Sequence, residues 1–265
     1  MNGVRTLVAH HWQRYRRPLV PMALGLALFE FLITRIAPAP DEVSWMTRMI
    51  AFVPPQVLAI AGADAGGFTP AGFVALGYAH PFFFLLLGAW AVRVSSGALA
   101  GEIGLGTMDL LASRPVARWQ HVAAGALVVV GGLAVLVAAA WAGTAAGLTL
   151  RPLGVPIAGT WRAPAMAWLL FAAWGAVGLA IGATQRESGS AMGWTAGAMA
   201  VSFVVEYLAR VWRTVAWLRP ASLFAYDDPQ RLARSGLAAA DVLVLGLVVS
   251  AALAVAAATF ARRDL

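Results

Sequence analysis

The chain has 265 residues, of which 61% are hydrophobic and only 12% are charged, with a net charge of +7 and a mean hydropathy of +0.77. Because a soluble domain of this size carries about 25% charged residues, this composition excludes an ordinary soluble protein and predicts a membrane protein. The absence of cysteine excludes disulfides and thiolate chemistry, and the absence of lysine excludes ATP binding through a Walker A loop.

The N-terminal segment is predicted to form an amphipathic helix that lies in the headgroup layer of a membrane. Apolar and aromatic residues recur at helical spacing from Val4 to Tyr15, with arginine and glutamine on the other faces. The segment lacks a small-residue cleavage site after a short apolar core, so we expect it to be retained rather than removed as a signal peptide.

Six apolar runs are each long enough to cross a bilayer, which requires about 20 residues. We therefore expect an all-α, polytopic membrane protein with six transmembrane helices, organised as a single domain over residues 1–265. The predicted spans are Pro18–Ile36, Ala71–Val94, Val116–Leu148, Ala163–Thr184, Ala191–Leu208 and Val242–Phe260.

The arginines indicate the orientation of the chain. Six crossings place both termini on one side, and the arginines divide almost equally between the two sides. The basic cluster before the first span and the Arg262–Arg263 pair near the end favour the cytoplasm for both termini, so we expect a location in the bacterial inner membrane. Because the arginines lie at helix ends, they suit membrane lipids as partners and give no support for nucleic acid.

Two segments on the opposite side are long enough to form short interfacial or re-entrant helices. Pro38–Pro70 contains apolar residues at helical spacing, and Arg210–Ala240 contains apolar residues followed by a turn-like acidic pair, Asp227-Asp228. We expect both segments to cover the outer face and the acidic pair to serve turn formation.

The stretch Gly101–Trp119 interrupts the apolar pattern between the second and third spans, on the predicted cytoplasmic side. Gly104 and Gly106 are expected to end the second helix. Thr107 is expected to cap a short helix that Pro115 ends. We expect this short helix to display apolar side chains beside charged ones, as a docking surface for another protein; the residues concerned are Met108, Leu110, Leu111, Glu102, Asp109, Arg114 and Arg118.

This stretch, GEIGLGTMDLLASRPVARW, resembles the signature of ABC-2 type transporter permeases, in which G-E and G-T precede an apolar run and a P-x-x-R ending. The ending LFAYDD…ATFARRDL is similar to the C-terminus of the same family, with an aromatic-acidic turn before the last helix and an F-x-R-R-D-L tail. The six-span plan also fits, so the resemblance covers essentially the whole chain.

The resemblance implies a membrane subunit that pairs with a second permease copy, as a homodimer, and with separate ATP-binding cassette ATPase subunits. ATP and Mg²⁺ would be bound by those partners, so the resemblance implies no catalytic, cofactor or metal site in this chain. In the family the inner loop is the coupling helix, which sits in a groove of the ATPase. Residue by residue, the resemblance assigns ATPase coupling to Glu102, Gly106, Thr107, Asp109, Leu111, Pro115 and Arg118.

Glu30 lies inside the first predicted span, and an intramembrane carboxylate is a functional-site hypothesis by default. It is therefore a candidate for the translocation pathway; pairing with Arg35 and neutral burial between helices are the alternatives. Glu206 and Arg210, four residues apart, are expected to form an ion pair at the outer end of the fifth span.

His10 and His11 are adjacent and are expected to point apart on a helix, and no H-E-x-x-H motif is present. A metal hydrolase is therefore unsupported. The alternative of a secondary transporter driven by an ion gradient would require several midplane ionisable residues and paired helix breaks, and only Glu30 fits. The sequence thus favours the permease of an ATP-driven exporter of a small molecule, drug, peptide or lipid.

Overall fold

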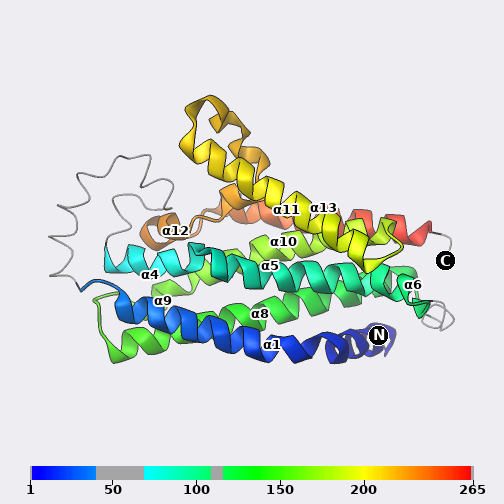
Figure 1. The fold of residues 1–265 in the computed structure, drawn as a ribbon, viewed down its shortest axis with the longest axis horizontal. Helices are drawn as coiled ribbons and strands as arrows, with labels where there is room; N and C mark the ends of the chain where they lie inside the picture. Colours follow the sequence, from blue (N-terminus) through cyan, green and yellow to red (C-terminus); the bar gives the residue numbers. More distant parts are fainter. Residues whose placement is uncertain (1, 40–68, 109–115, 264–265) are drawn as a thin grey trace.

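The structure, a computed structural model, describes residues 2–39, 69–108 and 116–263 (Figure 1). All regular secondary structure in these residues is helical. Six helical segments among them are long and apolar enough to cross a membrane, which confirms the predicted fold class. They are Gly3–Ile36, Pro70–Gly104, Arg118–Leu150, Ile157–Thr184, Ser188–Val211 and Ala239–Ala261.

In the described part of the first three spans and their connections, the helical elements are α1 (Asn2–Ile36), α4 (Pro70–Ala79), α5 (Pro81–Ser96), the π-helix η1 (Gly97–Gly101), α6 (Glu102–Gly104) and α8 (Arg118–Leu150). The second half contains α9 (Ile157–Thr160), α10 (Arg162–Thr184), α11 (Ser188–Val211), the 3-10 helices η2 (Arg213–Ala221) and η3 (Leu223–Tyr226), α12 (Pro229–Ser235) and α13 (Ala239–Ala261). Figure 1 shows both termini at the same end of the bundle, as an even number of crossings requires.

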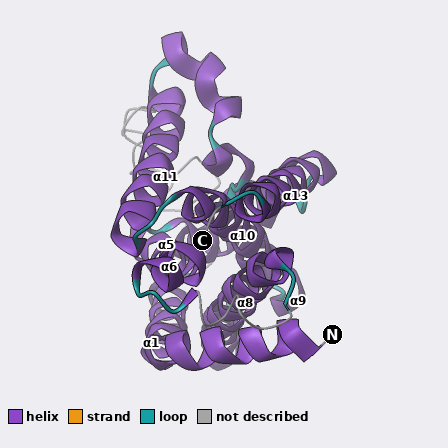
Figure 2. Cartoon of the chain, turned by 90° about the vertical axis from the view of Figure 1, so that its right-hand side faces the viewer, coloured by secondary structure: helices purple, strands orange, loops and turns teal. Residues whose placement is uncertain are grey.

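The predicted amphipathic segment and the first span form one helix, α1, which contains Pro18 and Pro21. Figure 2 shows the N-terminal part of α1 lying across the bundle. Proline inside a helix removes a backbone hydrogen bond and bends the helix, which accounts for this change of direction. The face that carries Leu7, Tyr15 and Leu19 is buried, so the amphipathic segment packs its apolar side on the protein.

The second span is interrupted twice, and the sequence analysis foresaw neither interruption. His80 has an extended backbone between α4 and α5, and its Nδ1 accepts a hydrogen bond from the backbone N–H of Phe82 at 3.1 Å. Pro81 then occupies the first position of α5, where a missing N–H costs nothing. The second interruption is η1, and π-turns inside α-helices are frequent at functional sites.

The core lies where α5, α8 and α10 meet. The indole N–H of Trp90 in α5 donates to the carbonyl of Val129 in α8 at 3.0 Å. A Cβ added to Gly178 of α10 would lie 2.1 Å from the hydroxyl oxygen of Ser95, so this glycine allows α10 to approach α5 closely. These contacts make the three helices the fixed centre of the bundle.

The fifth and sixth spans are far less enclosed than the second. Only 17% of the apolar window of α11 and 11% of that of α13 are buried within the chain, against 67% for the second span. Figures 1 and 2 show α11 leaning away from the other helices. Their outer faces are therefore available to lipid or to another chain.

The outer segment after α11 folds into short helices, as predicted. The carboxylate of Asp228 accepts a hydrogen bond from the backbone N–H of Arg231 at 3.1 Å and so begins α12, which confirms its role in turn formation. The predicted pair of Glu206 and Arg210 is confirmed at 2.6 Å, and Arg219 joins it at 3.2 Å. The predicted helix of Pro38–Pro70 falls almost wholly outside the described residues.

Candidate functional site

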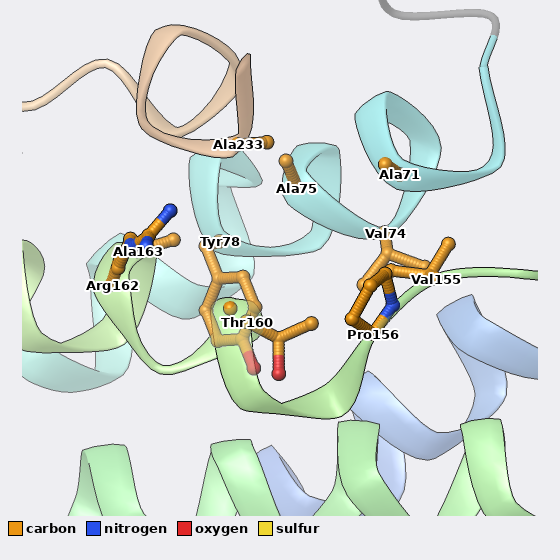
Figure 3. Close-up of a pocket in the computed structure, with 11 residues that line it drawn as sticks. Ala71, Val74, Ala75, Tyr78, Val155, Pro156, Thr160, Arg162, Ala163 and Ala233 are labelled. Atoms are coloured by element: carbon orange, nitrogen blue, oxygen red, sulfur yellow. The ribbon is translucent and has the colours of Figure 1, made fainter. Parts of the chain in front are cut away.

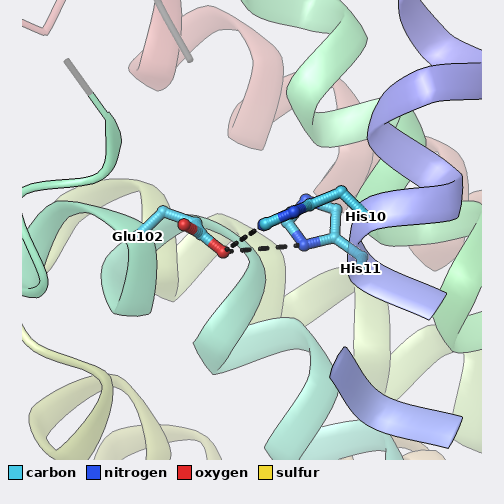
Figure 4. Close-up of side chains that lie close together, drawn as sticks. All are labelled: His10, His11 and Glu102. Atoms are coloured by element: carbon cyan, nitrogen blue, oxygen red, sulfur yellow. Dashed lines mark hydrogen bonds and ion pairs between the residues drawn. The ribbon is translucent and has the colours of Figure 1, made fainter. Parts of the chain in front are cut away.

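A network centred on Glu102 joins the N-terminal helix to the end of the second span (Figure 4). The Glu102 side chain is only 1% exposed, and its Oε1 accepts a hydrogen bond from Nη1 of Arg14 at 2.9 Å. The same oxygen lies 3.2 Å from Nε2 of His10 and 3.9 Å from Nδ1 of His11. Its Oε2 accepts a hydrogen bond from the hydroxyl of Thr107 at 2.5 Å. One buried carboxylate thus connects α1 to the turn after α6.

The prediction that His10 and His11 point apart is wrong with respect to Glu102, because both rings approach its carboxylate (Figure 4). The side chain of His10 is 45% exposed, whereas that of His11 is fully buried. One ligand atom from each of these three residues lies within 4.8 Å of the others, a spacing that a metal ion could use. Arg14 already binds the carboxylate with its own positive charge, which disfavours a metal ion there.

The turn after the second span forms as predicted at Gly104 and Gly106. Gly106 has φ +67°, which glycine adopts without strain. The backbone N–H of Thr107 donates to the carbonyl of Glu102 at 3.0 Å. The Thr107 hydroxyl donates to Glu102, and the residues that it is predicted to cap lie outside the described residues. Asp109, Leu111 and Pro115, which the motif match assigns to coupling, lie outside the described residues.

Two residues predicted at the docking surface are in fact buried within this chain. Glu102 is enclosed by the network described above, and Met108 is 2% exposed. Met108 belongs to an apolar cluster that includes Leu99 of η1 and Phe260 of α13. The left-handed turn at Gly106 brings the chain back to the bundle, a reversal that local sequence spacing does not reveal.

Arg118, at the first position of α8, binds the end of the chain. Its guanidinium donates to the carbonyl of Phe260 at 3.2 Å and to that of Arg263. The guanidinium of Arg263 in turn donates to the carbonyl of Ala183, near the end of α10, at 2.6 Å. The two parts of the sequence that resemble the family signature, the inner loop and the tail, are therefore in direct contact.

Glu30 is buried between α1, α4 and α8. Its Oε2 accepts a hydrogen bond from the hydroxyl of Thr144 at 3.5 Å, and that hydroxyl also lies 2.6 Å from the hydroxyl of Tyr78. A Cβ added to Gly77 would lie 2.5 Å from Oε2, so α4 approaches the carboxylate closely. Of the two alternatives to a pathway role, the structure agrees with burial between helices and not with pairing to Arg35.

Tyr78 also borders a small cavity of about 190 Å³ beneath α12 (Figure 3). Thr160 and Arg162 lie on other parts of its wall, and the remaining lining is largely apolar. Ligand sites usually enclose about 300–1,000 Å³, so this cavity is too small for a drug-sized molecule.

Two larger cavities lie along α5 and α11. The outer cavity, of about 550 Å³, lies at the end opposite the termini and includes His80, Glu206, Tyr207 and Asp227 in its lining. The side cavity, of about 610 Å³, is almost entirely apolar. Four residues line both cavities, so the two are adjacent: Pro81, Phe84, Phe203 and Phe224.

Asp227 is the most unusual group in the outer cavity, and sequence analysis placed it only in a turn. It is 3% exposed, and within the described part of the chain neither carboxylate oxygen has a hydrogen-bond partner. Burial, together with the neighbouring charge of Asp228, raises the pKa of Asp227 to about 8. The adjacent acids Asp227 and Asp228 are visible in the sequence as a turn signal, but the sequence does not indicate that Asp227 is buried.

Six helices long and apolar enough to cross a membrane, among the described residues, define a polytopic membrane protein. Residues 28–265 match the family described as ABC-2 family transporter protein, and the chain belongs to that family. A comparison with curated proteins gave no match.

Family membership makes the chain a permease of an ABC transporter and implies a partner subunit with an ATP-binding cassette. It favours this function over the alternative of a secondary transporter. The helix α6, which begins with Glu102, lies at the end of the bundle that holds both termini (Figure 1).

Proposed function

We propose that this permease is one half of an ATP-driven exporter, built from two permease copies and two cassette subunits that bind and hydrolyse ATP. The observation that carries the proposal is the buried network at Glu102, which ties α1 to the end of the second span through two motif residues, Glu102 and Thr107. A segment anchored in this way moves with two membrane-spanning helices and can transmit force to them.

In this proposal the segment from Glu102 to Arg118 docks in a groove of the cassette. ATP changes the permease only if one arrangement of the cassettes binds this segment better than the other. Asp109, Leu111 and Pro115 are the residues we expect at the contact. Glu102, with Thr107 and Gly106, supports the segment from within, and Arg118 extends the connection to the C-terminal residues.

The interruptions in the second span allow a movement of the segment from Glu102 to Arg118 to tilt α5 within the membrane. Here η1 and the break at His80 are two places where a tilt of α5 can be absorbed without breaking the packing of its centre. A tilt of α5 against α11 would change the shape of the outer and side cavities, which lie between these helices. We place the export pathway along this surface.

A second copy of the chain would close this pathway. The described part of one chain leaves α11 largely uncovered, with exposed fractions of 64% for Val201, 50% for Val204 and 39% for Tyr207. Facing copies of α5 and α11 would enclose the cavities between them, so we favour a homodimer. We place both termini in the cytoplasm of a bacterium, with the chain in its inner membrane, because the basic residues near both ends favour that side.

Glu30 stays a prediction as a residue of the pathway. It borders neither the outer nor the side cavity, and its neighbours belong to the packing of α4 and α8 on α1. This position favours a role in joining those helices.

The coupling role is tested by Asp109→Arg in a tagged permease expressed in its native cell. We expect the unaltered permease to co-purify with an ATPase that carries a Walker A lysine, and the variant to lose that partner. Arg213→Glu, an exposed charge reversal at the opposite end of the bundle, is the matched control and should retain the partner. Both variants should elute as folded, monodisperse protein.

Retention of the ATPase by Asp109→Arg, with unchanged stimulation of its ATP turnover, would contradict the coupling role. Cargo movement in vesicles that contain the purified permease and no ATPase would contradict ATP-driven export altogether.

A further inference from the structure

The outer cavity contains a buried carboxylate without a partner, and we propose that Asp227 binds the ammonium group of a lipophilic amine there. Binding at Asp227 would be a property of the permease alone and would not require the export proposed above.

The first reason is that nothing else in the described chain satisfies this carboxylate. Charged groups are buried in proteins only when they are paired and hydrogen-bonded. Both oxygens of Asp227 are shielded from solvent, and neither has a hydrogen-bond partner. A group that donates hydrogen bonds and carries a positive charge is the ligand that such a site lacks.

The second reason is that neither neighbouring guanidinium donates a hydrogen bond to Asp227. Arg210 and Arg231 are the two guanidiniums whose charges act on Asp227. Arg210 donates to Glu206 at 2.6 Å, and Arg231 donates to Asp241. Within the described residues, Asp227 is therefore left without an ion-pair or hydrogen-bond partner.

The third reason is the apolar wall of the cavity. Phe84 and Phe203 have ring centroids 5.7 Å and 5.4 Å from that of Phe224, and all three residues line the cavity. Aromatic faces attract cations and bury hydrocarbon. At about 550 Å³, the cavity is of the size that drug-sized ligands occupy.

The same features argue against a metal ion. Within the described residues, the one group of three histidine or acidic side chains spaced for a metal ion is His10, His11 and Glu102, at the other end of the bundle. Asp228, the nearest acid in sequence, already uses Oδ1 to cap α12. An organic ammonium group needs one carboxylate and an apolar surround, which is what the cavity offers.

Binding should strengthen as pH rises. Burial holds the pKa of Asp227 near 8, so an amine that stays protonated meets a neutral acid at pH 6 and a carboxylate at pH 9. The charged and titratable groups around Asp227 are Asp228 on its own segment, Glu206 and Arg210 on α11, His80 between α4 and α5, and Arg231 on α12. Linkage predicts an affinity that rises roughly tenfold per pH unit below pH 8 and levels off above it.

The test uses the permease alone in nanodiscs of zwitterionic lipid, with a dansyl-labelled hexylamine as the probe and its N-acetyl derivative as the neutral control. We expect saturable binding of the amine and not of the acetylated compound. Asp227→Asn should weaken amine binding on the order of tenfold or more, as loss of a charge-assisted hydrogen bond would. Glu187→Gln, which removes the charge of an exposed acid at the opposite end of the bundle, is the control, and it should bind as tightly as the unaltered protein.

Equal binding of the two probes would overturn the proposal, and so would unchanged binding by Asp227→Asn or an equal loss in both variants. The pH series on the unaltered protein is a second test that needs no variant to fold, and an affinity that falls between pH 6 and pH 9 would also overturn it. Because no ATPase is present, failure here would leave the proposed export function standing.

Discussion

Glu102 and Asp227 are buried carboxylates at opposite ends of one bundle, and their surroundings differ. Glu102 receives hydrogen bonds from Arg14 and Thr107 and has two histidines beside it. Asp227 has no hydrogen-bond partner within the described chain. A satisfied buried carboxylate fixes the elements that satisfy it, whereas an unsatisfied one in a cavity is suited to binding a ligand. The two proposals therefore assign force transmission to the end that contains Glu102 and ligand binding to the end that contains Asp227.

The largest effect on stability should come from removing the Glu102 carboxylate. Glu102→Ala leaves Arg14, Thr107 and the buried His11 without their shared partner. We expect a loss of about 3 kcal/mol in the free energy of unfolding, as for removal of one member of a buried polar network. Thermal or denaturant unfolding in detergent measures it. Glu187→Ala, an exposed acid at the same end, should change stability little, and equal losses in the two variants would contradict the role of the network.

At the other end of the bundle, Asp227 should make the stability of the protein depend on pH. The folded pKa of Asp227 is about 8 and its unfolded value is about 4, so the folded state holds the proton more tightly. Its contribution to stability is therefore lost as pH rises towards 8, by about 2 kcal/mol between pH 6 and pH 8. Asp227→Asn should remove this slope, which unfolding measured at several pH values would show. An identical slope in both proteins would mean that Asp227 is not buried as the structure has it.

A smaller effect on stability tests whether α1 packs on the second span at Gly97. A Cβ added to Gly97 would lie 1.9 Å from the hydroxyl oxygen of Tyr15, whereas at Gly101 the nearest atom, on Ser188, is 3.6 Å away. Both glycines belong to η1, so alanine brings a similar helix propensity at each position. We expect Gly97→Ala to be less stable than Gly101→Ala by about 1 kcal/mol, and equal melting temperatures would show that α1 does not pack there as described.

The sequence was sufficient for the architecture because hydropathy over about 20 residues reports membrane crossing directly. It also located the break at Gly106 and the Glu206–Arg210 pair, since both depend on residues close in sequence. The sequence analysis could not predict contacts between residues that are far apart in the chain. Nothing local indicates that Glu102 meets Arg14, 88 positions earlier.

The buried state of Asp227 was hidden for the same reason, because it depends on the packing of α4, α11 and α12 around one short segment. The break at His80 is different. Pro81 is a local signal for it in the sequence, and the sequence analysis did not use that signal.

The central claim is that the segment between the second and third spans meets a cassette in the cytoplasm. Because the natural chain has no cysteine, Leu111→Cys gives a single reactive thiol in that segment. A membrane-impermeant maleimide should label it in inside-out vesicles and not in intact spheroplasts, and binding of the cassette should protect it. Labelling from the periplasmic side, or labelling in inside-out vesicles that the cassette leaves unchanged, would contradict the account.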